Sequence, residues 1–266
     1  MPTFLSSFLL TLTSLLPLAA CTDRQASAPD GSTTESLPTA HSSPSVAQKP
    51  DCSPLVRWKA GTVVTDSIVA AYGEHRCFSI LPIDDATFKR MRGRSYKEGC
   101  TVARNDLRLL HVLHRNEKGE TQLGEMVCHH SIASDLLDIF RQLYAARYTV
   151  ARMVLIDDYE ADDERSMTAN NSSCFNFRRV AGSKVLSKHS RGLAVDINPL
   201  RNPMVKRRAD GKLTVSPTAG RRWADRSRPF AQRIDHADLA YRLFTAHGFR
   251  WGGNWRSVKD YQHFEK

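Results

Sequence analysis

Two short segments, far apart in the chain, carry the side chains that most constrain its fold. The first holds His189 and Asp196, seven residues apart, and the second holds Asp260 and His263. Imidazole nitrogens and carboxylate oxygens are ligands that zinc accepts in tetrahedral sites, and three protein ligands leave one position for water. If these side chains share one metal, the fold must bring the region around residue 190 and the end of the sequence together.

We predict that His189, Asp196 and His263 bind Zn²⁺. Bound zinc lowers the pKa of its water from roughly 15.7 to about 7, so hydroxide is available at neutral pH. Asp260 is the predicted general base that takes the water proton. Because Asp260 precedes His263 by three residues, the two side chains would face opposite ways on a straight strand. We therefore expect a bend between them.

Each of these residues is a weak signal by itself. A His and an Asp at this spacing are more often structural than a ligand pair. The chain has 10 histidines, and the pair His129–His130 is better explained as the start of the following helix than as a metal pair. The combination of ligands and base carries the prediction.

The first 20 residues predict export. Residues 1–20 are largely apolar, but the run is short and is interrupted by Pro17, which argues for a signal peptide and against a membrane span. Leu18–Cys21 resembles a bacterial lipobox, although the segment before it has no Lys or Arg; a plain secretory signal is the alternative. Acyl chains on Cys21 would anchor the protein without a spanning helix. We expect a lipid-anchored protein of the bacterial cell envelope, facing the periplasm or cell wall.

Residues 21–50 are predicted to be the lipidated cysteine and a disordered tether. They are rich in Ser, Thr, Ala and Pro and almost lack large apolar side chains, so they cannot bury enough surface to offset chain entropy. Such a tether lets an anchored domain move out from the lipid. Residues 51–266 form the folded domain, with its core motifs in 150–266.

Composition limits the classes of partner. The chain has 266 residues and 41% hydrophobic content, enough for one sizeable domain or two small ones. A net charge of +10 suggests an anionic partner: nucleic acid, anionic lipid or an acidic cell-envelope polymer. The basic runs Lys206–Arg208 and Arg221–Arg222 have no aromatic platform or recognised nucleic-acid module beside them. Together with export, this predicts no nucleic-acid partner.

The cysteines suggest disulfide bonds. Five follow Cys21 in the sequence, and export makes bridges possible. We expect bridges among the first four, in any of three pairings, with at least one thiol left over. The five are Cys52, Cys77, Cys100, Cys128 and Cys174.

Hydrophobic periodicity and breaker residues predict an α+β fold, a small antiparallel sheet with packed helices and the zinc site in a cleft on the sheet. The expected elements are a helix at 132–148, a buried strand at 149–156, a loop at 157–164, a strand at 193–198, a long surface loop at 201–230, a helix at 232–247 and a strand at 249–251.

Three C-terminal motifs resemble a known family. They are Ser187-x-His189-x-x-Gly192-x-Ala194-x-Asp196, Gly248-Phe249-x-Trp251-Gly252-Gly253-x-Trp255 and Asp260-x-x-His263-Phe264. The pattern is similar to the D-alanyl-D-alanine carboxypeptidase and L-alanyl-D-glutamate endopeptidase family of zinc peptidases, relatives of the vancomycin-resistance dipeptidases. The resemblance spans most of residues 90–266. It implies the same three zinc ligands and Asp260 as base; several relatives carry Glu there, and the endopeptidase branch carries Asp.

The resemblance also implies residues that bind the substrate. Ser187 would help to hold the substrate backbone. In relatives an arginine near the site stabilises the anionic tetrahedral intermediate, and Arg178 is our assignment, with Arg165 and Arg179 as competitors.

The resulting expectation is an exported zinc metallopeptidase that hydrolyses peptide bonds in peptidoglycan stem peptides, either as a carboxypeptidase or as an endopeptidase. The alternative is a non-catalytic cell-wall-binding module that retains the metal site, as hedgehog-type relatives of this fold group illustrate. The complete set of ligands and base argues against that loss of activity.

Overall fold

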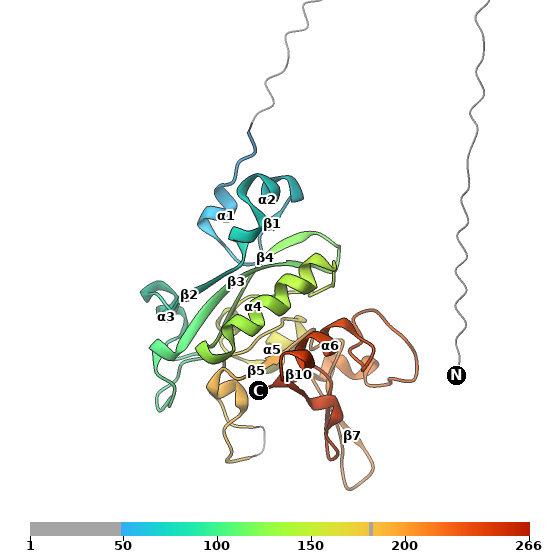
Figure 1. Cartoon of the computed structure of the whole chain (residues 1–266). Coiled ribbons are helices and arrows are strands. Elements are labelled where there is room, and N and C mark those ends of the chain that lie inside the picture. The colour runs from blue at the N-terminus through green and yellow to red at the C-terminus, as the bar shows by residue number, and fades with distance from the viewer. Residues whose placement is uncertain (1–48, 181–182) are drawn as a thin grey trace, which may run out of the picture. The chain divides into compact units, whose positions relative to one another are not determined.

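The computed structural model describes residues 49–180 and 183–266, which is the predicted folded domain 51–266 except residues 181–182. The predicted signal peptide, the lipidation site Cys21 and the tether as far as residue 48 lie outside the described residues. Three antiparallel sheets and several short helices make up the described part (Figure 1). This confirms the predicted α+β class.

The largest sheet has the strand order β1-β4-β3-β2. Its strands are β1 (Val63–Val64), β2 (Ser79–Pro82), β3 (Leu107–Arg115) and β4 (Thr121–His129). Strands β3 and β4 pair over their whole length, from Leu107 opposite His129 to Arg115 opposite Thr121. Both strands are buried at most positions, because α4 covers one face and the chain around residues 150–176 packs on the other.

Helix α4 (His130–Ala145) is the predicted long helix; it begins two residues earlier and ends three residues earlier than expected. Its apolar residues recur at helical spacing and face the core, including Leu136 and Phe140. His129 is its N-cap: the ring Nδ1 accepts a hydrogen bond from the Ser131 amide at 3.2 Å. The pair His129–His130 therefore begins a helix, as expected.

Shorter helices surround this sheet: α1 (Ser53–Arg57), α2 (Asp66–Tyr72), η1 (Glu74–Cys77), α3 (Asp85–Met91) and η2 (Arg104–Asp106). Among residues 49–180 and 183–266, no helix is long and apolar enough to span a membrane.

The predicted strand at 149–156 is wrong: this buried segment makes only isolated bridges, at Thr149 and Arg152. Asparagine side chains replace a sheet partner. The Asn171 amide bonds both the N–H and the C=O of Val154, at 2.9 and 3.1 Å. Asn198 accepts from the Ala151 N–H at 2.9 Å and donates to the Thr149 carbonyl at 2.8 Å. The predicted loop at 157–164 is mostly helical, with η3 (Ile156–Tyr159) and α5 (Asp163–Thr168).

Two small sheets build the C-terminal part. One has the order β5-β10-β8, and the other has the order β7-β6-β9. Their strands are β5 (Ala194–Asp196), β6 (Met204–Arg207), β7 (Leu213–Ser216), β8 (Arg250–Trp251), β9 (Lys259–Asp260) and β10 (His263–Glu265). The predicted strands at 193–198 and 249–251 are confirmed as β5 and β8, both shorter than expected.

The predicted surface loop at 201–230 is also wrong, because β6 and β7 form a hairpin there. Val205 pairs with the buried Val215, and the Arg208 N–H donates to the Lys212 carbonyl at 2.8 Å to close the turn. Gly211 adopts a φ of 78°, a conformation that glycine tolerates best. The helix η5 (Thr218–Trp223) follows.

Helix α6 (Leu239–Ala246) begins seven residues later than the predicted 232–247. Asp238 caps it by accepting from the Ala240 N–H at 2.9 Å. Before the cap, Asn202 holds the backbone of Ile234 with a 2.8 Å hydrogen bond. Two 3₁₀ helices complete the fold: η4 (Lys188–Arg191) and η6 (Gly252–Asn254).

The cysteine prediction is contradicted. All five cysteines within the described ranges are free thiols, so no bridge joins Cys52, Cys77, Cys100 or Cys128 there. Cys77 and Cys128 are completely buried and pack as small apolar side chains in the core. Burial raises the pKa of the Cys77 thiol to about 11.

We predict that Asn198→Ala destabilises the protein by about 2 kcal/mol, because two partly buried backbone groups lose their partners and alanine must adopt the φ of 46° found at this position. Urea unfolding of the full chain measures this change. Asn105→Ala, at an exposed position, is the matched control and should stay within about 0.5 kcal/mol of wild type. Equal stability of the two variants would contradict the account of segment 149–156.

Candidate metal centre

Strands β5 and β10 bring Asp196 and His263 together. The two strands are antiparallel neighbours, and their register sets His263 directly opposite Asp196. Opposite residues point to the same face of a sheet, with Cβ atoms about 5 Å apart. Residues separated by 67 positions in the sequence therefore share one buried location.

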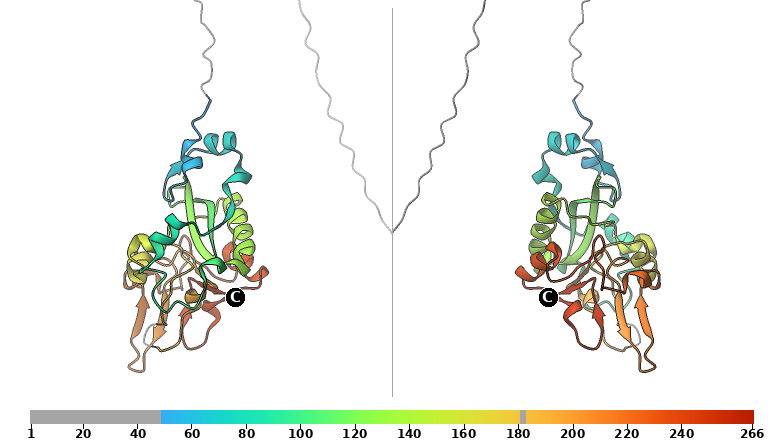
Figure 2. Two further views of the ribbon diagram at one scale, coloured as in Figure 1. Left: turned by 90° about the vertical axis from the view of Figure 1, so that its left-hand side faces the viewer. Right: turned by 90° about the vertical axis from the view of Figure 1, so that its right-hand side faces the viewer.

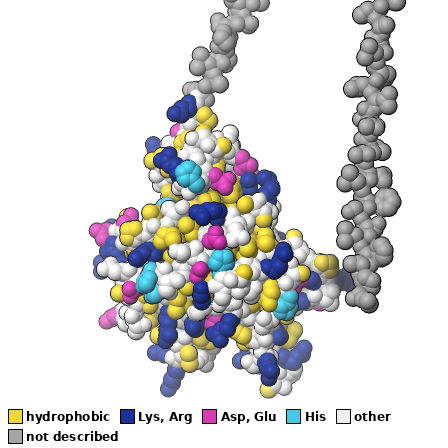
Figure 3. Space-filling model, in the orientation of Figure 1, with side chains coloured by type: hydrophobic (Ala, Val, Ile, Leu, Met, Phe, Trp, Pro, Cys, Tyr) yellow, Lys and Arg dark blue, Asp and Glu magenta, His cyan; other side chains and the backbone are white. Residues whose placement is uncertain are grey.

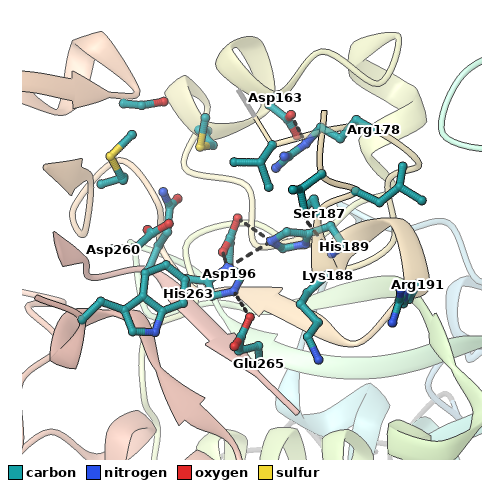
Figure 4. A pocket seen from close by; sticks show the side chains of 18 of the residues that line it. Asp163, Arg178, Ser187, Lys188, His189, Arg191, Asp196, Asp260, His263 and Glu265 are labelled. Carbon is teal, nitrogen blue, oxygen red and sulfur yellow. Dashed lines mark hydrogen bonds and ion pairs between the residues drawn. The ribbon is translucent and has the colours of Figure 1, made fainter. Parts of the chain in front are cut away.

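The short helix η4 supplies the third side chain. Ser187 caps η4 by accepting from the His189 N–H, and Gly192 follows the last helical residue with a φ of 64°. A Cβ at Gly192 would lie 2.6 Å from the backbone nitrogen of His129, so only glycine fits. The Nδ1 atom of His189 lies 2.6 Å from the Cys174 carbonyl, and this contact turns Nε2 toward Asp196 and His263 (Figure 4).

The three side chains form a compact donor set. His189 Nε2 lies 3.2 Å from His263 Nδ1 and 3.3 Å from an oxygen of Asp196, and His263 Nδ1 lies 3.1 Å from the other oxygen. Two ligands of a tetrahedral zinc ion, each about 2.1 Å from the metal, lie about 3.4 Å apart. The spacing and donor chemistry therefore fit a metal such as zinc, and this is the group among the described residues that could hold an ion.

The pKa values in this cluster favour an ionised Asp196 and a protonated His263. Burial alone would raise the pKa of Asp196, but the facing imidazoles of His189 and His263 outweigh it, so the pKa lies well below its usual range. Burial opposes charge on His263 too, yet the carboxylates of Asp196 and Glu265 raise the pKa of this imidazole to about 10. A divalent cation would have to displace that proton to bind the ring.

Glu265 is a residue of the site that sequence reasoning missed. Its carboxylate lies 3.4 Å from His263 Nε2, the ring nitrogen that faces away from Asp196, and 2.8 Å from a nitrogen of Arg250. A carboxylate on the outer nitrogen of a ligating His fixes the ring and its tautomer. The i, i+2 spacing on β10 was the available signal, because both side chains lie on one face of a strand.

Asp260 lies beside this cluster, on β9 (Figure 4). The expected bend occurs at residues 261–262, between β9 and β10. One oxygen, Oδ1, is buried and has no hydrogen-bond partner among the described residues. Burial raises the pKa of Asp260 to about 6; the His263 charge opposes this shift and the Asp196 charge adds to it. A half-buried carboxyl with one buried, unused oxygen can exchange a proton near neutral pH.

Gly252 allows Asp260 to reach this position. A Cβ at residue 252 would lie 2.7 Å from the Asp260 carbonyl oxygen and 2.9 Å from the Asp260 Cβ. The sequence analysis noted Gly252 only as part of a motif. The structure shows that a side chain there would displace Asp260.

The cluster opens into a pocket of about 600 Å³. Ser187, Arg178 and Trp255 line it together with Asp260. Trp255 also packs against His263, with ring centroids 5.2 Å apart. Arg178 pairs with Asp163, a second pocket residue that sequence reasoning missed.

Of the three arginines considered from the sequence, Arg178 is the one in the pocket lining. Arg165 and Arg179 are exposed and lie outside that lining.

Comparison with known proteins finds one family for the C-terminal part of the chain. Residues 181–266, about a third of the chain, match the family model described as D-alanyl-D-alanine carboxypeptidase. The match confirms the resemblance to this peptidase family, and it covers all three donors and Asp260. No curated protein and no solved structure matches the chain.

We predict that Glu265→Gln weakens zinc binding by about tenfold to a hundredfold, because the amide holds the outer nitrogen of His263 less strongly than a carboxylate does. Equilibrium dialysis of the full chain against buffered zinc measures the affinity. Glu98→Gln, an exposed acid with the same loss of charge, is the control. Equal zinc affinities in these two variants would rule out the positioning role of Glu265.

Proposed function

We propose that this protein is an exported zinc metallopeptidase that hydrolyses peptide bonds in peptidoglycan stem peptides, as a carboxypeptidase or an endopeptidase. The observation that carries the proposal is the meeting of three buried donors, 3.1 to 3.3 Å apart, with Asp260 beside them, whose Oδ1 has no hydrogen-bond partner among the described residues. The family match supports a peptidase. The finer assignment rests on the motifs that resemble wall-cutting zinc peptidases.

His189, Asp196 and His263 would hold the zinc ion, His189 through Nε2 and His263 through Nδ1. When bound, zinc supplies Lewis acidity that activates a water molecule at neutral pH and polarises the scissile carbonyl. Cys174 and Glu265 keep the outer nitrogens of the two rings occupied.

Asp260 is the proposed general base. Its carboxylate accepts a proton from the attacking water and then gives this proton to the leaving amine. A pKa of about 6 suits both steps, because the group is mainly ionised at pH 7 and still readily protonated. Gly252 keeps the backbone of Asp260 close to the pocket wall.

Arg178 and Ser187 are proposed to bind the substrate. The Arg178 guanidinium lines the pocket and would stabilise the negative charge that develops on the carbonyl oxygen. Its pairing with Asp163 restricts its orientation. The Ser187 oxygen accepts from the His189 N–H, so its own hydroxyl proton remains available for a substrate carbonyl.

The N-terminal assignments belong to the same proposal. A signal peptide at 1–20, acylation of Cys21 and a tether through residue 50 would place the catalytic domain, residues 51–266, within reach of the wall from a membrane surface.

We predict that Asp260→Ala lowers kcat on defined stem peptides by about a hundredfold to ten-thousandfold, the usual contribution of a general base, while bound zinc stays at the wild-type level. Mass spectrometry of the products measures activity and identifies the bond that is cut. Asp51→Ala, at an exposed position, controls for loss of a carboxylate. Unchanged activity would reject Asp260 as the base. Wild-type protein that is retained on intact sacculi without releasing fragments would favour the non-catalytic wall-binding module.

The pKa of Asp260 predicts the acid side of the pH profile. The base must be ionised, so kcat/KM should rise with pH through an inflection at or below about 6, because a nearby dication further favours the carboxylate. Initial rates between pH 4 and 8, with zinc content followed in parallel, measure this inflection. An inflection above pH 7 would contradict the assignment.

A further inference from the structure

The sheet β7-β6-β9 connects the catalytic pocket to a projecting hairpin. Met204 pairs with Ser216 on one side and with Asp260 on the other, and all three residues line the pocket. From this end, β6 and β7 run outward and form a projection at the end of the domain opposite α1 and α2 (Figures 1 and 2). The hairpin is therefore continuous with one wall of the pocket.

The other face of the same sheet carries a separate groove of about 190 Å³. Its lining combines apolar and cationic side chains: Val205, Arg207, Leu213, Arg256, Ser257, Val258 and Lys259. Alternation along the strands explains the separation, because Lys259 faces the groove whereas its neighbour Asp260 faces the pocket. Groove and pocket thus lie back to back across the short strand β9.

The cations of the groove lack acidic partners. Among the described residues, Arg207, Arg256 and Lys259 form no ion pair. Arg207 donates to the Gly211 carbonyl at 3.0 Å, and Lys259 donates to the Gly253 carbonyl at 3.2 Å. The surrounding surface adds further positive charge, and Lys and Arg side chains are visible along this end of the molecule (Figure 3).

Further basic side chains lie on the hairpin and after it. These are Lys206, Arg208, Lys212, Arg221 and Arg222; of them only Arg208 forms an ion pair within the described part of the chain, with Asp210 at 3.2 Å. A cluster of one sign raises the local concentration of an oppositely charged ligand.

We propose that this groove, together with the β6–β7 hairpin, is a docking surface for the carboxylate-bearing wall polymer, and that it holds stem peptides next to the one being cut. The inference rests on the proposed function. Free carboxylates complement Arg207, Arg256 and Lys259, and the methyl groups of alanyl residues complement Val205 and Val258.

The back-to-back geometry requires the partner to be a polymer. One stem peptide in the pocket would have to wrap around β9 to reach the groove, whereas a strand with several stem peptides can occupy both sites. A single exposed ion pair contributes little, but tethered contacts act at high effective concentration. The groove should therefore matter for intact wall and not for a single short peptide.

The test compares Arg207→Gln/Arg256→Gln with the control Arg57→Gln/Arg92→Gln. Both double variants lower the formal net charge from +10 to +8, and all four arginines are exposed. Binding to purified sacculi is measured by co-sedimentation of the full chain carrying Asp260→Ala as well, so that hydrolysis does not interfere. Thermal unfolding of each variant verifies that it is folded.

At about 50 mM salt we expect the groove variant to bind sacculi about tenfold more weakly than wild type and the control to change less than about twofold, with the difference vanishing near 0.5 M salt. Converting the carboxylates of the sacculi to amides should weaken binding of the wild type. The remaining affinity should equal that of the groove variant for untreated sacculi. In the background with Asp260 intact, kcat/KM on one soluble stem peptide should be the same in groove variant and wild type.

Equal retention of the groove and control variants on sacculi would overturn the proposal. It would also be overturned if the groove variant lost binding to anionic phospholipid vesicles or to DNA while keeping its binding to sacculi. Failure of the proposed function gives a different result: the wild-type protein would leave stem peptides uncut. If retention on sacculi still depended on the groove in that case, the docking surface would be upheld.

Discussion

The structure of the site depends on the pairing of β5 with β10. This register sets Asp196 opposite His263 and gives the two side chains one face of a small sheet. The remaining parts are arranged around that pair: η4 adds His189, and the bend before β10 adds Asp260. A slip of one residue between the strands would turn either Asp196 or His263 to the opposite face and remove the donor set.

Buried charge explains why these residues occur together. Asp196 and His263 are almost inaccessible to water, and an isolated ion in such a place is costly. Each group is stabilised by its neighbours, through the contacts among His189, Asp196 and His263 and the outer contact with Glu265. Asp260 differs, since its buried oxygen lacks a partner among the described residues. An unsatisfied buried group of this kind is typical of a functional site.

The sequence was sufficient to predict the convergence of the donors, the bend at 261–262 and the helix that became α4, because each has a strong local signal. It was insufficient where side chains, and not a neighbouring strand, form the hydrogen bonds to a backbone segment. Segment 149–156 is rich in β-forming residues, yet Asn171 and Asn198 satisfy part of its backbone.

Residues 201–230 are basic and turn-rich, which predicts a loop. The pairing of β6 with β7 nevertheless makes part of this segment a hairpin. Glu265 was overlooked although strand alternation predicts its contact with His263.

The central claim remains that His189, Asp196 and His263 share one cation. Anomalous diffraction at the zinc edge, from crystals of the zinc-loaded protein, tests it most directly. The account predicts one peak about 2.1 Å from both imidazole nitrogens and an Asp196 oxygen; a peak elsewhere, or none, would contradict it.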